Sequence, residues 1–127
     1  MEMTLRKITE ILDAQVLTGS DLLDKISVER AGAADLMSDV LAYSHAGALL
    51  LTGLANAQSL HTADMAELKA IVYVRGKQPN EETIRLAASR LIPLLKTELG
   101  MFESCGQLHR AGLMDNGKSL TRPGTKG

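Results

Sequence analysis

The chain has 127 residues, the usual size of one domain, and its 45% hydrophobic and 23% charged residues are close to globular averages. This balance argues against a disordered protein, a coiled coil and a membrane protein. Its 14 basic and 15 acidic residues leave a net charge of -1, and its aromatic residues are Tyr43, Tyr73 and Phe102. The chain therefore offers neither the basic field nor the stacking surface typical of nucleic-acid binding, and we expect no nucleic-acid partner.

Localisation is predicted from three observations. The longest apolar runs fall far short of the roughly 20 residues that span a bilayer, and the segment Met1–Lys7 has no apolar signal core behind its charges. The single cysteine, Cys105, cannot form an internal disulfide and fits a reducing compartment. We expect a cytoplasmic protein with no membrane partner, no metal and no cofactor.

The first third of the chain predicts one helix and two strands. Thr4 can cap a helix whose apolar residues recur at helical spacing as far as Leu12. Residues 14–19 predict a short strand with a glycine exit, residues 20–25 a polar turn or single helical turn, and residues 26–32 a second strand.

The middle of the chain alternates helices with wholly apolar strands. Asp35 is predicted to cap a helix over residues 36–43, because its carboxylate can accept from the free amides of the first turn. A strand is predicted over residues 48–51, and Asn56 then caps a helix that extends to about residue 68.

The last third repeats the pattern. A strand over residues 70–74 precedes Pro79–Glu82, which place a cap and two acids at the start of a helix. Residues 92–95 predict the last strand, and an amphipathic helix follows to about Gly112. The polar stretch 114–127 predicts a flexible tail behind a domain formed by residues 1–113.

This alternation predicts a single α/β domain, a three-layer α/β/α sandwich with a largely parallel sheet of four to five strands. Apolar strands of this kind are covered on both faces, and open α/β sheets bind ligands at the carboxyl ends of their strands. The pattern favours a binding module over a catalyst.

The order and spacing of five segments resemble the DRTGG domain family over about residues 3–113. These are Asp-Leu-Leu-Asp at 21–24, Ala-Asp-Leu-Met-Ser-Asp-Val-Leu at 34–41, Leu-Leu-Thr-Gly at 50–53, Val-Tyr-Val-Arg-Gly-Lys at 72–77, and Ile-Pro-Leu-Leu at 92–95 followed by Thr97.

That family is similar to the non-catalytic N-terminal domain of HPr kinase/phosphorylase. The resemblance implies a regulatory or ligand-sensing α/β module, often a homodimer. Stand-alone members of this size are often encoded beside iron-only hydrogenase subunits, which implies an accessory role in redox metabolism and a hydrogenase-related partner. The chain departs from the family's name motif at Gly53–Asn56 and from its second Thr-Gly-Gly at Val74–Lys77.

Two glycine turns after apolar strands supply the candidate ligand-binding residues. Thr52, Gly53 and Asn56 can present a hydroxyl, an amide and a helix start to an anion or a nucleotide. The alternative is that Gly53 only permits a turn and that Asn56 only caps a helix.

The second turn carries positive charge. Arg75 and Lys77 flank Gly76 and can hold a phosphate or carboxylate, or else form a solvated loop. If the two loops lie side by side, they form the best anion site in the chain, to which the resemblance adds Thr97.

A phosphate-loop spacing occurs at Gly112–Ser119. A working phosphate loop needs a strand before it and a helix after it, whereas here a helix is predicted before it and only eight residues follow. A kinase or hydrolase is therefore the third hypothesis for function.

Other reactive or metal-binding side chains are isolated. Cys105 has no adjacent base and is expected to be a buried structural residue, and His45, His61 and His109 lack ligand spacing. Three methionines are expected to fill the core, although an exposed methionine face can serve an interface: Met37, Met65 and Met101.

The sequence thus favours a non-catalytic module that binds a small anionic or nucleotide-like ligand and modulates a partner enzyme. The alternative is a ligand-free interaction or scaffold protein that uses a methionine-containing face or the basic tail.

Overall fold

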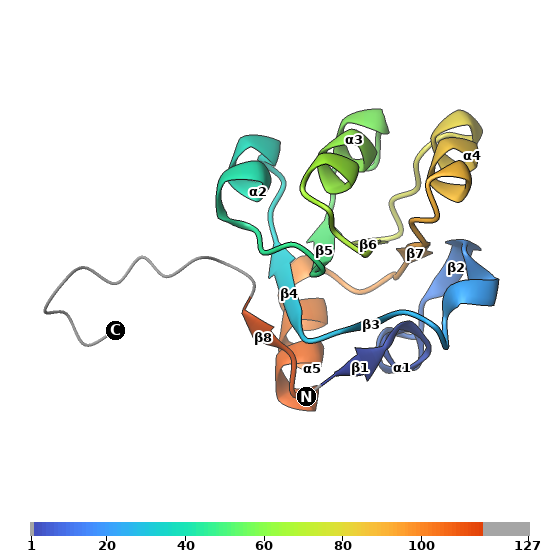
Figure 1. The fold of residues 1–127 in the computed structure, drawn as a ribbon. Helices are drawn as coiled ribbons and strands as arrows, with labels where there is room; N and C mark the ends of the chain where they lie inside the picture. Colours follow the sequence, from blue (N-terminus) through green and yellow to red (C-terminus); the bar gives the residue numbers. More distant parts are fainter. Residues whose placement is uncertain (1, 116–127) are drawn as a thin grey trace, which may run out of the picture.

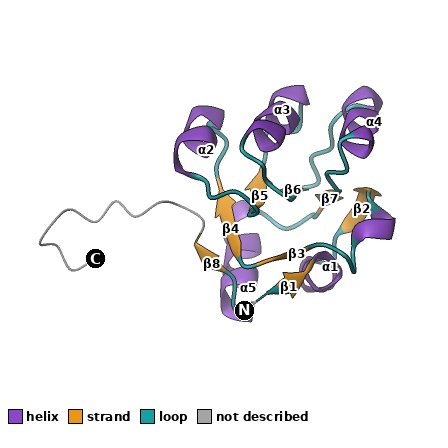
Figure 2. Cartoon of the chain, in the orientation of Figure 1, coloured by secondary structure: helices purple, strands orange, loops and turns teal. Residues whose placement is uncertain are grey.

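Strands and helices alternate along residues 2–115, which are the residues that the computed structural model describes (Figure 1). The strands are β1 (Met3–Thr4), β2 (Gln15–Thr18), β3 (Ser27–Val28), β4 (Arg30–Ala33), β5 (Leu49–Thr52), β6 (Ala70–Tyr73), β7 (Leu94–Lys96) and β8 (Met114–Asp115). The helices are α1 (Leu5–Leu12), α2 (Met37–Tyr43), α3 (Ala57–Met65), α4 (Glu81–Ser89) and α5 (Met101–Ala111), with a 3₁₀ turn at Ser20–Leu22 (Figure 2).

Six strands form one sheet in the order β2-β7-β6-β5-β4-β8. All neighbours in it are parallel except β2 and β7, which run antiparallel. The largely parallel sheet confirms the predicted α/β class, with six strands instead of four to five. The extra strand is β8, which pairs with Arg30 and Ala31 of β4, although its two residues were assigned to the tail.

The predicted three layers are present (Figure 1). Helices α2, α3 and α4 cover one face of the sheet, and α1 and α5 cover the other. Alternate residues of β5 serve the two faces: Leu49 and Leu51 pack with α1 and α5, whereas Leu50 packs with the other three helices. A strand buried on both sides in this way needs apolar residues at every position, which explains the unbroken apolar run.

Local capping chemistry places several helix starts as predicted. Thr4, Asn56 and Asn80 each accept a hydrogen bond from the backbone amide three residues ahead. These side chains satisfy amides that the first turn of a helix leaves free.

The single strand predicted over residues 26–32 is two strands in the structure: β3, which pairs with β1 outside the main sheet, and β4.

The methionine prediction is partly wrong. Met37 is buried in the core and Met101 is half-buried, but Met65 is 72% exposed.

No helix within residues 2–115 has the length and apolar character needed to cross a bilayer. The rest of the predicted tail, residues 116–127, lies outside the described residues.

Candidate functional site

The loops after β4, β5 and β6 meet at one edge of the sheet, because parallel strands end on the same side. Thr52 at the end of β5 is in register with Tyr73 at the end of β6, and the Val74 amide donates to the Thr52 carbonyl at 3.1 Å. The two glycine turns that the sequence singled out are therefore neighbours. We call the group formed by Asp35, Thr52, Gly53 and Arg75 the strand-end site.

Asp35 plays a different part from the predicted one. It does not cap α2: the helix begins at Met37, and its N-cap position is Leu36, which makes no side-chain hydrogen bond. One oxygen of the Asp35 carboxylate instead accepts from the Gly53 amide at 2.7 Å and from the Thr52 hydroxyl at 3.0 Å. The Asp35 side chain thus ties the loop after β4 to the loop after β5.

Thr52 holds the first glycine turn in place. Its side chain is fully buried, donates its hydroxyl proton to Asp35 and accepts from the Leu54 amide at 3.1 Å. The turn is thereby fixed with the Gly53 amide directed at the Asp35 carboxylate.

Arg75 reaches over the same turn. A Cβ atom built on Gly53 would lie 3.6 Å from both carboxylate oxygens of Asp35 and 3.7 Å from Nη2 of Arg75. The carboxylate and the guanidinium therefore border one space beside Gly53. The Arg75 backbone adopts a φ of 57° and donates its amide to the Leu99 carbonyl at 2.8 Å.

An acidic residue that the sequence reasoning missed, Glu98, lies against the second glycine turn. Gly76 has a φ of 68°, which glycine adopts readily, and donates its amide to the Thr97 carbonyl at 2.8 Å. A Cβ atom there would come within 2.6 Å of a carboxylate oxygen of Glu98. Lys77, the second predicted cation, is exposed beside this turn.

Two other predicted residues use their oxygen atoms within the chain. Asn56 is exposed, but its side-chain oxygen caps α3 by accepting from the Ser59 amide at 3.3 Å. Thr97 is buried, donates to the Leu12 carbonyl at 2.8 Å and accepts from the Leu99 amide at 3.2 Å. Both therefore help to shape the loops on either side of the two glycine turns.

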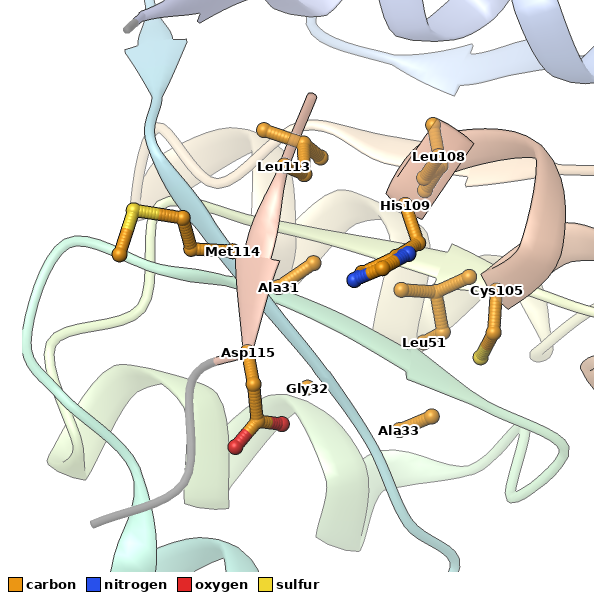
Figure 3. A pocket seen from close by; sticks show the side chains of 10 residues that line it. All are labelled: Ala31, Gly32, Ala33, Leu51, Cys105, Leu108, His109, Leu113, Met114 and Asp115. Carbon is orange, nitrogen blue, oxygen red and sulfur yellow. The ribbon is translucent and has the colours of Figure 1, made fainter. Parts of the chain in front are cut away.

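A cavity of about 240 Å³ lies between α5 and the strands β4 and β8, on the α1 and α5 side of the sheet (Figure 3). It exists because β4 contributes only small residues there. None of the predicted ligand-binding residues lines it. Its walls are Ala31, Gly32, Ala33, Leu51, Cys105, Leu108, His109, Leu113, Met114 and Asp115.

Cys105 borders this cavity and is half-buried, where the sequence predicted a buried residue. Burial raises the pKa of its thiol, the opposite of the shift that activates a nucleophile.

Within residues 2–115, no three histidine, cysteine or acidic side chains gather closely enough to hold a metal ion. Gly112 ends α5, so a helix precedes the phosphate-loop spacing, and its residues 116–119 lie outside the described part.

Sequence patterns gave a partial signal for the missed residues. Asp35 comes soon after β4, as Arg75 comes soon after β6, but it also precedes a helix, so capping competed as an explanation. Glu98 follows β7 in the same way. An acidic residue close behind a parallel strand was the signal available in both cases.

Comparison with known proteins finds a family model that matches most of the chain. A family model described as the DRTGG domain matches residues 7–111, which confirms the resemblance seen in the sequence. No curated protein matches. A solved structure of the CBS and DRTGG domains from the regulatory region of Clostridium perfringens pyrophosphatase, complexed with the activator diadenosine tetraphosphate, superposes with a TM-score of 0.69 at 15% identity. The match covers 92% of this chain and 51% of that one, so this chain spans about half the length of that structure.

Proposed function

The chain belongs to the DRTGG domain family, and from this membership we propose that it is a non-catalytic regulatory module which binds a small anionic or nucleotide-like ligand and modulates a partner enzyme. The ligand is held at the strand ends after β5 and β6. Hydrogenase-linked redox metabolism is the proposed setting, and a cytoplasmic homodimer the proposed form, as the family resemblance implies.

The observation that carries this proposal is the convergence of donors beside Gly53. The Gly53 amide, the Thr52 hydroxyl and the Arg75 guanidinium border one space at the carboxyl edge of a parallel sheet. Backbone amides and guanidinium groups are the donors that proteins direct at phosphate and carboxylate groups. This edge is also where open α/β sheets bind their ligands.

The remaining predicted residues have supporting parts in the proposal. Lys77 is exposed beside the Gly76 turn and adds a second positive charge. Gly76 supplies the left-handed backbone that the turn needs, while Asn56 and Thr97 fix the loops on either side.

The solved neighbour supports a nucleotide-like ligand, because that regulatory region is complexed with a dinucleoside polyphosphate activator. Several phosphate groups in one ligand would suit a site with both Arg75 and Lys77.

The proposal is tested by thermal-shift measurements against adenine nucleotides, diadenosine tetraphosphate, pyrophosphate, acetyl phosphate and nicotinamide cofactors. A ligand at 100 times its dissociation constant stabilises the folded state by about 2.7 kcal/mol, which such an assay detects readily. We expect a shift that Arg75→Ala abolishes. Arg85→Ala is the matched control, because Arg85 lies on α4 with an exposed Glu81 partner. A shift that persists in Arg75→Ala would place the ligand elsewhere.

The scaffold alternative has one observation in its favour. Met65 on α3 is 72% exposed and Phe102 on α5 is 91% exposed, so each can contact a partner protein from its own side of the sheet. No shift with any ligand, together with co-purification of a partner that Phe102→Ser releases, would favour this alternative.

A further inference from the structure

The donors of the strand-end site are not free, because the chain's own Asp35 already occupies them. Its carboxylate accepts from the Gly53 amide at 2.7 Å and from the Thr52 hydroxyl at 3.0 Å, with the Arg75 guanidinium bordering the same space. These are the contacts that a bound anion would make. The 2.7 Å separation is that of a strong, charge-assisted hydrogen bond.

We propose that Asp35 is the specificity-determining residue of this site: it stands in for the ligand's anionic group, and only a phosphoryl group displaces it. The inference rests on the proposed function and deepens it by naming the ligand class as phosphoryl compounds and excluding simple carboxylates.

The position of Asp35 supports a role beyond holding the fold. The residue is exposed and forms no cap for α2, and the adjoining Thr52 keeps a second internal hydrogen bond, with the Leu54 amide, when Asp35 moves away. The Leu54 amide therefore keeps its acceptor without the carboxylate. The Asp35 side chain is held by the same groups that a ligand would use.

Charge explains the selectivity. A carboxylate ligand carries the same single charge as Asp35 but must give up its free motion to bind, whereas Asp35 is already tethered there. A phosphoryl group carries about -1.5 to -2 charges near neutral pH and three acceptor oxygens. It can therefore accept from the Gly53 amide, the Thr52 hydroxyl and the Arg75 guanidinium with separate oxygens. The Asp35 carboxylate, by contrast, uses a single oxygen for both the Gly53 amide and the Thr52 hydroxyl.

Displacement also gives the site a route to the rest of the molecule. Asp35 lies two residues before Met37, the first residue of α2. A phosphoryl group that removes the Asp35 carboxylate from Gly53 would release the loop that leads into this helix. Ligand binding at β5 and β6 is thereby connected to α2.

The test is a titration of the full chain with pyrophosphate, followed through its backbone amide NMR signals. Asp35→Asn keeps a side-chain oxygen that can accept from Gly53 and removes the charge that competes. We expect this variant to bind pyrophosphate about tenfold more tightly than the wild type, a difference of about 1.4 kcal/mol. The signals of Gly53 and of residues 37–43 should move together in the wild type.

Asp39→Asn is the matched control, because Asp39 is another exposed aspartate close to the start of α2 that makes the same change in net charge. It should bind pyrophosphate as the wild type does. A second variant, Asp35→Ala, should bind acetate with a shift of the Gly53 signal, because acetate can fill the vacated position, whereas the wild type should not respond to acetate.

The outcomes separate this inference from the proposed function. Wild-type binding at Gly53 that Asp35→Asn leaves unchanged or weakens would overturn the inference and leave the function standing. Binding by Asp35→Asn alone would mean that pyrophosphate does not displace Asp35 in the natural protein, which would overturn the inference and count against a ligand-sensing role. No response of either protein at millimolar pyrophosphate would overturn both.

Discussion

Two fully buried serines, Ser59 and Ser104, predict opposite effects of the same substitution. The Ser59 hydroxyl donates to the Asn56 carbonyl at 2.8 Å and shares a hydrogen bond of 2.9 Å with the Tyr73 hydroxyl. The Ser104 hydroxyl, on α5, finds no hydrogen-bond partner among the described residues. Ser59→Ala therefore removes a buried hydroxyl that is hydrogen-bonded, whereas Ser104→Ala removes a buried hydroxyl that is not.

The magnitudes follow from the cost of burying a polar group without a partner. Such a group costs about 1–3 kcal/mol, and alanine is also a slightly better helix former than serine. We expect Ser104→Ala to raise the free energy of unfolding by about 1 kcal/mol, which corresponds to about 4 °C in Tm for a domain of this size. Ser59→Ala should lower the free energy of unfolding by about 1–3 kcal/mol, because the Tyr73 hydroxyl loses its partner.

Urea unfolding followed by circular dichroism measures both changes, with unchanged m values as the check that unfolding stays two-state. The reasoning would be refuted if Ser104→Ala destabilised the protein to the same extent as Ser59→Ala. That result would mean that the Ser104 hydroxyl is satisfied in solution.

Two further predictions concern backbone strain and pH. Gly19→Ala should destabilise the fold by more than about 2 kcal/mol, since the φ of Gly19 is 92° and the new Cβ would come within 2.8 Å of the Pro93 Cα. Gly112→Ala should cost only about 1–2 kcal/mol, because Gly112 has a φ of 118° but a Cβ there would have no neighbour within 4 Å. Equal losses of stability in urea unfolding would contradict this prediction. Burial raises the pKa of Tyr73 above its ordinary 10.0, so the unfolded chain loses this proton at lower pH than the folded one, and stability should fall as the pH rises beyond 10. Tyr73→Phe should show a smaller fall in Tm over that range, and an identical fall would count against the assignment.

The sequence predicted the architecture well, because the signals for it are local. Each wholly apolar strand can be read from four or five consecutive residues, and each cap from a side chain and the amide three residues ahead, as at Asn56 and Asn80. Strand β8 escaped notice because two residues carry no periodicity. Its existence depends on Arg30 and Ala31 of β4, more than 80 positions earlier in the chain.

The strand-end site was predictable in position but not in its contacts. Neighbouring parallel strands bring Gly53 and Arg75 together, which follows from topology alone. The hydrogen bond between Asp35 and Gly53 does not follow from topology alone, because the two residues lie 18 positions apart in the sequence. A local preference, capping of α2, competed with a tertiary hydrogen bond, and only the packing of β4 against β5 decides between them.

Arg75 shows how the site departs from what local preference would select. Among residues 2–115, four non-glycine residues have positive φ angles. Three of them, Asp13, Glu67 and Leu91, follow the ends of α1, α3 and α4, where a left-handed residue commonly terminates a helix. Arg75 instead follows a strand, where a long side chain in this conformation costs about 1–2 kcal/mol. Glycine would form the same turn without that cost but would lack the guanidinium beside Asp35, so the strain at this position fits a residue required for its charge.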